Sequence, residues 1–138
     1  MLIFLLTAIT LQAEEKPITI DNLPVKAQQF ITQYYPDVAV ESTFIENRAS
    51  LTQYEVRMAN GDALQFNKAG QWTEIKCKKG SVPAALIPKR IYAYIVATYP
   101  EAKIKEFEHD DRLYEVRLNN QLELTFSSSF KLLDIDRK

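Results

Sequence analysis

The residue types that could perform acid–base or nucleophilic chemistry are scarce in this sequence of 138 residues. Its one histidine, His109, falls in the polar segment 108–111, where we expect an exposed turn. A catalytic serine or cysteine needs a neighbouring base, and the sequence has no second histidine. One cysteine, Cys77, and one histidine do not make a zinc site, and the three glycines form no phosphate-binding loop. The sequence therefore predicts no catalytic residue, no enzyme activity and no organic cofactor.

Oxygen ligands suited to calcium occur in two places. Glu108, Asp110 and Asp111 cluster in the expected turn, and Asp134 and Asp136 alternate along the last expected strand. Carboxylates are hard ligands of the kind that calcium prefers, although the spacing is not that of an EF-hand loop. Calcium binding at these residues is one hypothesis, and the other is that they are solvated surface charges.

A site for a protein partner is suggested by Trp72. Strict alternation along its strand places Trp72 with Glu74 on the face of the sheet opposite the helices, and Leu132 in the same way. Arg57 and Arg117 should point to that same outer face. A large aromatic residue beside arginine has the composition of an interface anchor. The alternative interpretation is that a bulge in the strand tucks Trp72 into the core.

The elements that must position these residues occur twice. Residues 54–57 read Tyr-Glu-Val-Arg, and residues 114–117 repeat them 60 positions later. Tyr35-Pro36 likewise returns 64 positions later as Tyr99-Pro100. Because the matches span an expected helix and several expected strands, we interpret the chain as an internal duplication. The predicted organisation is a signal peptide at 1–13, a first repeat at 14–77, a linker at 78–86 and a second repeat at 87–138, the repeats forming one globular domain.

Each repeat is predicted to contain one helix and four antiparallel strands. In the first repeat, apolar residues recur at helical spacing from Leu23 to Tyr34, and Pro36 should end the helix. Asn60-Gly61 predicts a two-residue type I′ hairpin, and residues 47–52 a longer loop. The period-two runs that predict strands are roughly 38–45, 54–58, 64–66 and 72–77.

The predicted fold class is α+β, with one continuous antiparallel sheet, both helices on one face and the other face exposed. This arrangement follows because each helix has one apolar stripe and each sheet one apolar face to bury. The charged pairs Glu55–Arg57 and Glu115–Arg117 should form cross-strand ion pairs on the exposed face. The side chains expected to face the helices are Tyr54, Val56, Met58, Leu64, Phe66, Ile75, Tyr114, Val116, Leu118, Leu124, Phe126 and Ile135.

The net charge and the amino-terminal residues limit which compartment and which partners are expected. The net charge is −1, with 17 basic and 18 acidic side chains, so no nucleic-acid partner is predicted. Residues 1–13 are uncharged, mostly apolar and end in alanine, which is typical of a secretory signal peptide whose start is truncated. An exported protein, without membrane insertion once the leader is cleaved, is therefore predicted. Cys77 should be buried and free.

Several segments together resemble the PepSY-like periplasmic proteins of Bacteroidetes. They are the Leu-Pro…Phe-Ile…Tyr-Tyr-Pro helix at 23–36, the Tyr-Glu-Val-Arg strand, the Asn-Gly hairpin, and Lys-Ala-Gly-Gln-Trp-Thr-Glu at 68–74, with their second copies. The resemblance covers about residues 17–136 and implies an architecture similar to the β-lactamase-inhibitor protein, whose concave sheet face serves for docking. It also implies inhibition of an envelope peptidase or another envelope protein, or regulation by calcium. The disulfides of the secreted inhibitor are missing, which argues against inhibition of a β-lactamase.

Two hypotheses about function follow. The first is a non-enzymatic module that binds an envelope protein or peptide through the outer sheet face, with Trp72 as its anchor. The second is a calcium-responsive envelope protein that uses its acidic loop and strand end. The sequence specifies neither the partner nor the oligomeric state.

Overall fold

The computed structural model describes residues 14–49 and 51–137, and the expected signal peptide at 1–13 lies outside them. The helices of the described residues are α2 (Val25–Tyr34) and α3 (Lys89–Thr98), with short 3-10 turns η1 (Ile20–Asn22) and η2 (Ala84–Leu86). The strands are β1 (Glu14–Pro17), β2 (Val40–Arg48), β3 (Leu51–Met58), β4 (Ala63–Asn67), β5 (Trp72–Lys76), β6 (Ile104–His109), β7 (Leu113–Leu118), β8 (Leu122–Ser127) and β9 (Leu132–Arg137). None of the described helices is long and apolar enough to cross a membrane.

Both helices begin and end at the expected prolines. Pro24 occupies the N-cap of α2, and its φ of −54° suits the start of a helix. At the other end, Tyr35 donates its N–H to the carbonyl of Ile31 at 2.8 Å, and Pro36 follows. A proline disfavours helical backbone at the residue before it, so α2 stops there. The same pattern closes α3, where Tyr99 donates to Ile95 at 2.7 Å.

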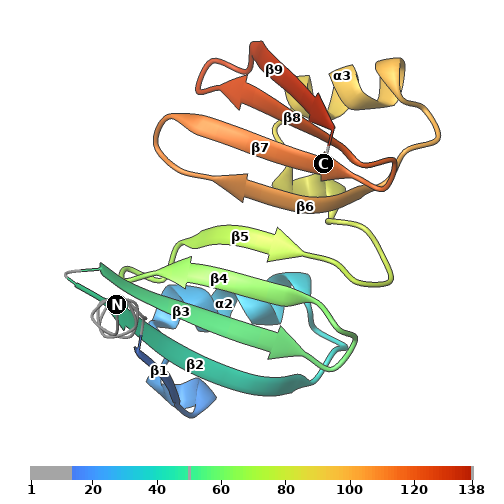
Figure 1. The fold of residues 1–138 in the computed structure, drawn as a ribbon. Coiled ribbons are helices and arrows are strands. Elements are labelled where there is room, and N and C mark those ends of the chain that lie inside the picture. The colour runs from blue at the N-terminus through green and yellow to red at the C-terminus, as the bar shows by residue number, and fades with distance from the viewer. Residues whose placement is uncertain (1–13, 50, 138) are drawn as a thin grey trace, which may run out of the picture.

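The nine strands of the described residues form one antiparallel sheet, in which they lie in the same order as in the chain (Figure 1). Strand β5 pairs with β6 and so joins the two halves, with Ile75 opposite Phe107. Both helices lie behind the sheet in Figure 1. Phe30 of α2 contacts Phe66, and Tyr94 of α3 contacts Phe126, with ring centroids 5.5 and 5.9 Å apart. The α+β prediction of one continuous sheet with helices on one face is confirmed.

The core lies between the helices and the sheet. Most of the side chains predicted to face the helices are fully buried, and Tyr54 and Tyr114 are half-buried against the cluster. Ile135 departs from the prediction, since it is 43% exposed although it pairs with the buried Leu124. The reason is position: β9 is an edge strand, whereas its counterpart Ile75 lies on the central strand β5.

The turns differ in detail from the predictions. The Asn60-Gly61 hairpin forms, but only Gly61 has positive φ, at 96°. Met58 donates to the carbonyl of Asp62 at 2.8 Å, so the loop has three residues and is not a type I′ turn. The longer loop expected at 47–52 is also wrong, because β2 continues to Arg48 and β3 starts at Leu51. Strand β1, which no sequence pattern predicted, pairs with β2 at the edge of the sheet.

Candidate functional site

A β-bulge decides where Trp72 points. Gln65 pairs with Glu74, but the next residue, Phe66, pairs with Trp72, so Thr73 is an extra residue in β5. Because paired residues project to the same side, Trp72 lies on the helix side with the buried Phe66. The prediction that Trp72 lies on the outer face is therefore wrong, and the bulge interpretation is correct.

Leu132 is displaced from the outer face in the same way. Thr125 pairs with Asp134 and Phe126 with Leu132, so Leu133 is the extra residue of β9. Leu132 therefore lies on the helix side with Phe126 and is 36% exposed at the edge of the sheet. The proposed binding residues are split between the two faces, since Arg57, Glu74 and Arg117 remain on the outer one.

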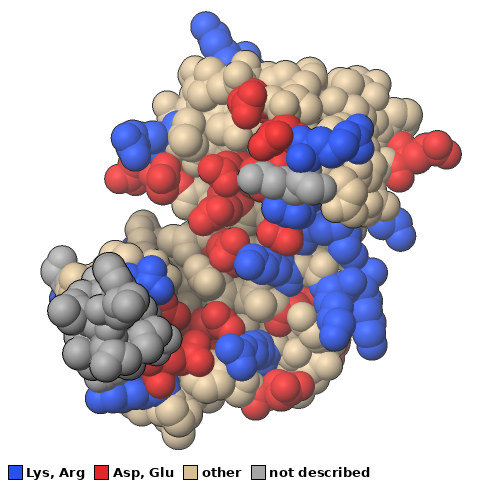
Figure 2. All heavy atoms as spheres, viewed as in Figure 1, with Lys and Arg blue, Asp and Glu red and all other residues tan. Residues whose placement is uncertain are grey.

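The outer face carries a row of acidic side chains across the middle of the sheet. Through the register, Glu55 is followed by Gln65, Glu74, Glu108 and Glu115 on successive strands, each directly opposite the next. We call Glu55, Glu74, Glu108 and Glu115 the acidic row. Figure 2, in the same view, shows acidic side chains gathered in the region where β5 and β6 meet. Glu108 joins this row because β6 also contains a bulge, between Ile104 and Glu106, which strict alternation does not predict.

Basic side chains flank this row on the same face, two residues farther along the strands. Arg57 binds Glu55 of its own strand, with Nε 2.7 Å from Oε2. Arg117 approaches Glu123 at 3.3 Å and Glu106 at 3.8 Å, both on neighbouring strands. The expected cross-strand pairing is therefore wrong for Glu55–Arg57, which lie on one strand. The predicted Glu115–Arg117 ion pair is wrong as well, because Arg117 pairs with Glu123 and Glu106.

The acidic row is incompletely neutralised. Burial raises the pKa of Glu74, the nearby Glu106 and Glu55 add to this, and Lys76 at 3.9 Å opposes it. Burial also raises the pKa of Glu108, and the negative charge of Glu74 adds to the effect. A positively charged group placed beside these carboxylates would stabilise their ionised form.

The five candidate calcium ligands do not converge. Glu108 is separated from Asp134 by β7 and β8, which places them about 14 Å apart at the usual strand spacing. Asp110 caps its own turn, where Oδ1 accepts the N–H groups of Arg112 and Leu113 at 2.8 and 2.9 Å. These bonds hold the pKa of Asp110 below its usual value. The described residues contain no group of three or more His, Cys, Asp or Glu side chains arranged to hold a metal ion.

His109 is the last residue of β6 and is half-buried, so its expected position in an exposed turn is wrong. Its Nε2 lies 2.9 Å from the carbonyl oxygen of Trp72, which can only accept, so Nε2 carries the proton. The ring lies 4.2 Å from that of Trp72 and stacks on Tyr114 at 5.8 Å. Through its hydrogen bond and ring contact with Trp72, His109 connects the end of β6 to the start of β5.

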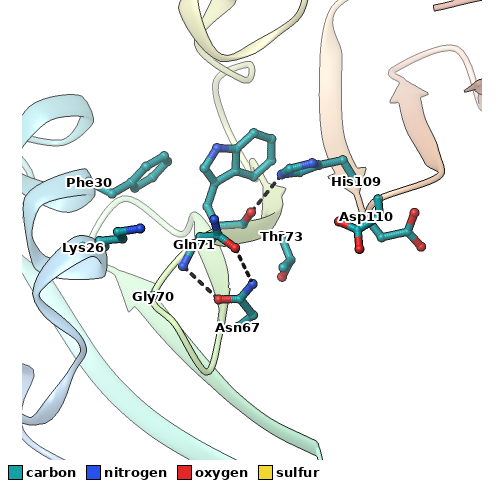
Figure 3. A pocket seen from close by; sticks show the side chains of 10 residues that line it. Lys26, Phe30, Asn67, Gly70, Gln71, Thr73, His109 and Asp110 are labelled. Carbon is teal, nitrogen blue, oxygen red and sulfur yellow. Dashed lines mark hydrogen bonds between the residues drawn. The ribbon is translucent and has the colours of Figure 1, made fainter. Parts of the chain in front are cut away.

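A cavity of about 420 Å³ opens beside Trp72 on the helix side (Figure 3). Lys26 and Phe30 of α2 form one side, and His109 and Asp110 form the other. Asp111 also lines the cavity. The turn after β4 closes it from below, and Gly70 packs there against the start of α2. Sequence patterns missed this site because its walls come from three elements far apart in the chain.

Cys77 is buried and free, as predicted. Its sulfur lies 3.5 Å from Oδ2 of the buried Asp62, which also accepts the hydroxyl of Tyr35 at 3.0 Å. Burial raises the pKa of the Cys77 thiol to about 12, and the negative charge of Asp62 adds to this. The cluster joins the end of α2 to the turn before β4 and the end of β5, and its thiol is protonated at neutral pH.

Comparison with known proteins identifies the relatives of this chain. The profile of a family described as "Putative beta-lactamase-inhibitor-like, PepSY-like" matches residues 52–134. A structure described as a "putative calcium-regulated periplasmic protein" from Bacteroides thetaiotaomicron is 42% identical, with a TM-score of 0.87 over 89% of this chain and 97% of the other. No curated protein matches the chain.

Two further structures come from Bacteroides vulgatus. One, described as a "putative periplasmic protein" from the DUF2874 family, is 40% identical, with a TM-score of 0.86 over 90% of this chain and 98% of the other. The second, also described as periplasmic, is 32% identical, with a TM-score of 0.84 over 91% and 99% of the respective chains. The matches cover nearly the whole described fold, and the chain therefore belongs to the PepSY-like, beta-lactamase-inhibitor-like family of periplasmic proteins.

Proposed function

We propose that this protein is a non-enzymatic binding module that captures a basic segment or surface of an envelope protein on its outer sheet face. The observation that carries the proposal is the acidic row, in which Glu74 and Glu108 have raised pKa values because partial burial, and to a lesser extent neighbouring carboxylates, disfavour their ionisation. A cationic partner relieves that repulsion when it binds.

The shape of the face supports an extended contact. The acidic row crosses five consecutive strands, β3 to β7, and no described helix lies on that side of the sheet. Arg57 and Arg117, at the borders of the row, are held by nearby carboxylates. In the middle, Lys76 approaches Glu74 at 3.9 Å, and the four carboxylates of the row outnumber it. A peptidase or another envelope protein with a Lys- and Arg-rich surface is the partner class that this pattern selects. Inhibition or regulation of that partner would follow from covering its surface.

Charge reversal in the row tests the proposal. The double variant Glu74→Lys/Glu115→Lys, immobilised beside the unchanged protein, should lose basic proteins that the unchanged protein captures from an envelope extract. Capture by the unchanged protein should weaken as salt rises, because exposed charges are screened.

The matched control reverses charge elsewhere. Glu101→Lys alters an exposed residue that follows α3 and lies outside the row, and it should leave capture intact. Far-UV circular dichroism confirms that each variant is folded. If the row variant captured the same basic proteins as the control, the outer face would not be the binding surface.

Calcium responsiveness is the second candidate function, and one observation favours it. The relative from Bacteroides thetaiotaomicron, 42% identical to this chain, is described as calcium-regulated. In this chain the candidate carboxylates are those of Glu108, Asp110 and Asp111 near the β6–β7 turn and those of Asp134 and Asp136 on β9. Since the described residues bring no three of them together as ligands, an ion would be held by one or two carboxylates at one of these places. Titration calorimetry and thermal melting with millimolar calcium, with magnesium as the control, test the idea. No heat and no melting shift would remove it.

We further infer that the two halves are copies of one helix-plus-four-strand unit. Matched irregularities support this inference, since the bulges of β5 and β9 put extra residues at Thr73 and Leu133, 60 positions apart. The bulges that involve Val40 and Ile104 lie 64 positions apart. Both spacings equal those of the sequence repeats.

A further inference from the structure

We propose that the cavity beside Trp72 binds a short peptide with free termini and an aromatic or apolar middle residue. This site lies on the helix side of the sheet, away from the acidic row, and it does not depend on the proposed function of the outer face. The term "Trp72 cavity" is used for it below.

The size of the Trp72 cavity suits two or three residues. A sphere of 420 Å³ would be about 9 Å across, and two to three extended residues span about 7–11 Å. The volume lies within the range of about 300–1,000 Å³ that is usual for small-ligand sites. A folded protein domain does not fit such a space, whereas a peptide of this length does.

One wall of the cavity consists of aromatic rings that contact one another. The Trp72 ring lies 6.2 Å from Phe30 and 4.2 Å from His109, so the three rings form a continuous surface. The Trp72–His109 hydrogen bond fixes that surface, and the ring of Phe107 packs against Trp72 at 5.6 Å. An aromatic side chain of a ligand gains both apolar burial and ring contacts on such a wall.

Opposite charges stand on opposite sides of this wall. Figure 3 shows Lys26 on the α2 side and Asp110 on the other side. Asp111, which also lines the cavity, follows Asp110 in the turn between β6 and β7. Among the described residues, neither Lys26 nor Asp111 forms an ion pair, and both hydrogen bonds accepted by Asp110 involve Oδ1. The arrangement complements a ligand with a carboxylate at one end and an ammonium group at the other. A peptide with free termini has this polarity, its carboxylate toward Lys26 and its ammonium toward Asp111.

Intrinsic fluorescence offers a direct test, because Trp72 is the one tryptophan of the chain. The mature protein is titrated at neutral pH with the tripeptide Ala-Phe-Ala, with excitation at the red edge, where tyrosine does not absorb. We expect a saturable change in Trp72 emission. Acetylation of the peptide amine or amidation of its carboxylate should each weaken binding several-fold, since each removes one charge.

Two variants assign the ends of the peptide. Lys26→Met should bind the free and the amidated peptide equally, and Asp111→Asn should bind the free and the acetylated peptide equally. Both residues are exposed, so neither change should disturb the fold. Lys79→Met and Asp37→Asn remove the same charges at exposed positions that do not line the cavity, and they should bind like the unchanged protein.

Three results would overturn the proposal. The first is no saturable change in emission with the free tripeptide. The second is equal affinity for free and doubly capped peptides, which would mean that the charges play no part. The third is an equal loss of affinity in Lys26→Met and Lys79→Met, which would mean that net charge and not this cavity is responsible. None of these results bears on the outer face, so the two proposals fail separately.

Discussion

At the scale of single residues, the two halves place different residues at the same left-handed position of an equivalent turn. Gly61 and Gln121 both follow a strand end and donate to the carbonyl three residues earlier, at 3.0 and 3.3 Å. Gly61 has φ of 96° and Gln121 has φ of 73°. Left-handed backbone costs a residue with a Cβ roughly 1–2 kcal/mol, a strain that glycine does not bear. At this turn, the second half therefore retains strain that the first half avoids.

Replacing Gln121 with glycine should stabilise the protein by about 0.5–1 kcal/mol, the relieved strain less the added freedom of the unfolded chain. Urea denaturation at neutral pH measures the change. Gly61→Gln is the matched reverse variant and should destabilise, because a Cβ there would lie 3.1 Å from that of Lys78 as well as strain the backbone. A destabilised Gln121→Gly variant would contradict the expectation.

The acidic row predicts a pH-dependent stability change in Glu74→Gln. The pKa of Glu74 is raised in the folded state, so its contribution to stability is present at low pH and is lost as pH rises through the folded-state pKa. At pH 7 the ionised carboxylate therefore costs stability, and the neutral amide should raise the melting temperature. Below about pH 4, where both side chains are uncharged, the difference should vanish.

The control for this variant is Glu101→Gln, at an exposed position outside the row. It should leave the melting temperature nearly unchanged at both pH values. A Glu74→Gln variant that melted lower at pH 7 than at acid pH, relative to the unchanged protein, would show that the ion pair with Lys76 outweighs burial.

Cys77 should be inert toward thiol reagents in the folded protein at pH 8. Only the thiolate reacts, and the pKa of about 12 leaves almost none of it. Because the folded-state pKa lies above the ordinary value, stability should fall between about pH 9 and 12 as the unfolded thiol ionises first. Reaction with a chromogenic disulfide, with and without denaturant, measures the reactivity. Rapid reaction of the folded protein would contradict a buried, protonated thiol.

At the scale of elements, Asp62 connects three of them. It accepts the Tyr35 hydroxyl at the end of α2 and lies beside Cys77 at the end of β5. It also occupies the end of the hairpin between β3 and β4, where its carbonyl accepts from Met58. Asp62 is only 6% exposed, so the groups that donate to it cannot replace it with water as a hydrogen-bond acceptor.

Asp62→Ala should destabilise the protein by about 1–3 kcal/mol, since it leaves the Tyr35 hydroxyl buried without a partner. Asp37→Ala, at an exposed position after α2, is the control and should change stability by less than about 0.5 kcal/mol. Urea denaturation measures both variants. The double variant Tyr35→Phe/Asp62→Ala should recover part of the loss, and the absence of recovery would mean that the hydroxyl is not the source of the cost.

At the scale of the whole molecule, the two halves share one core across the β5–β6 junction. Phe107 lies in that junction, is fully buried and pairs with Ile75 on one side and Val116 on the other. It also contacts Trp72 and stacks on Tyr114 at 5.9 Å. Unfolding one half alone would expose apolar side chains of the other half that pack against Phe107, so independent unfolding of the halves is unfavourable.

The protein should therefore unfold in one transition, with the midpoint from Trp72 fluorescence equal to that from circular dichroism. Phe107→Ala should lower the free energy of unfolding by about 3–5 kcal/mol and move both signals together. Leu133→Ala, which alters a side chain 58% exposed on the edge strand, is the control and should have little effect. Two separate transitions in the unchanged protein would show that each half folds alone.

The sequence by itself determined the parts that depend on local pattern. Helical spacing and the flanking prolines located both helices, and alternation assigned Val56, Leu64 and Phe66 to the core. The need to bury one apolar face predicted a single sheet with helices on one side. These features were predictable because each rests on the period of one element or on the chemistry of one residue.

Only the tertiary structure decided which face of the sheet a side chain occupies where one extra residue shifts the alternation. The bulges at Thr73 and Leu133 moved Trp72 and Leu132 from the predicted outer face to the helix side, and a bulge in β6 placed Glu108 in the acidic row. A period-two pattern cannot reveal such an extra residue, because bulges depend on hydrogen bonding with the neighbouring strand. The Trp72 cavity was equally hidden, since it exists only where α2, the turn after β4 and the end of β6 pack together.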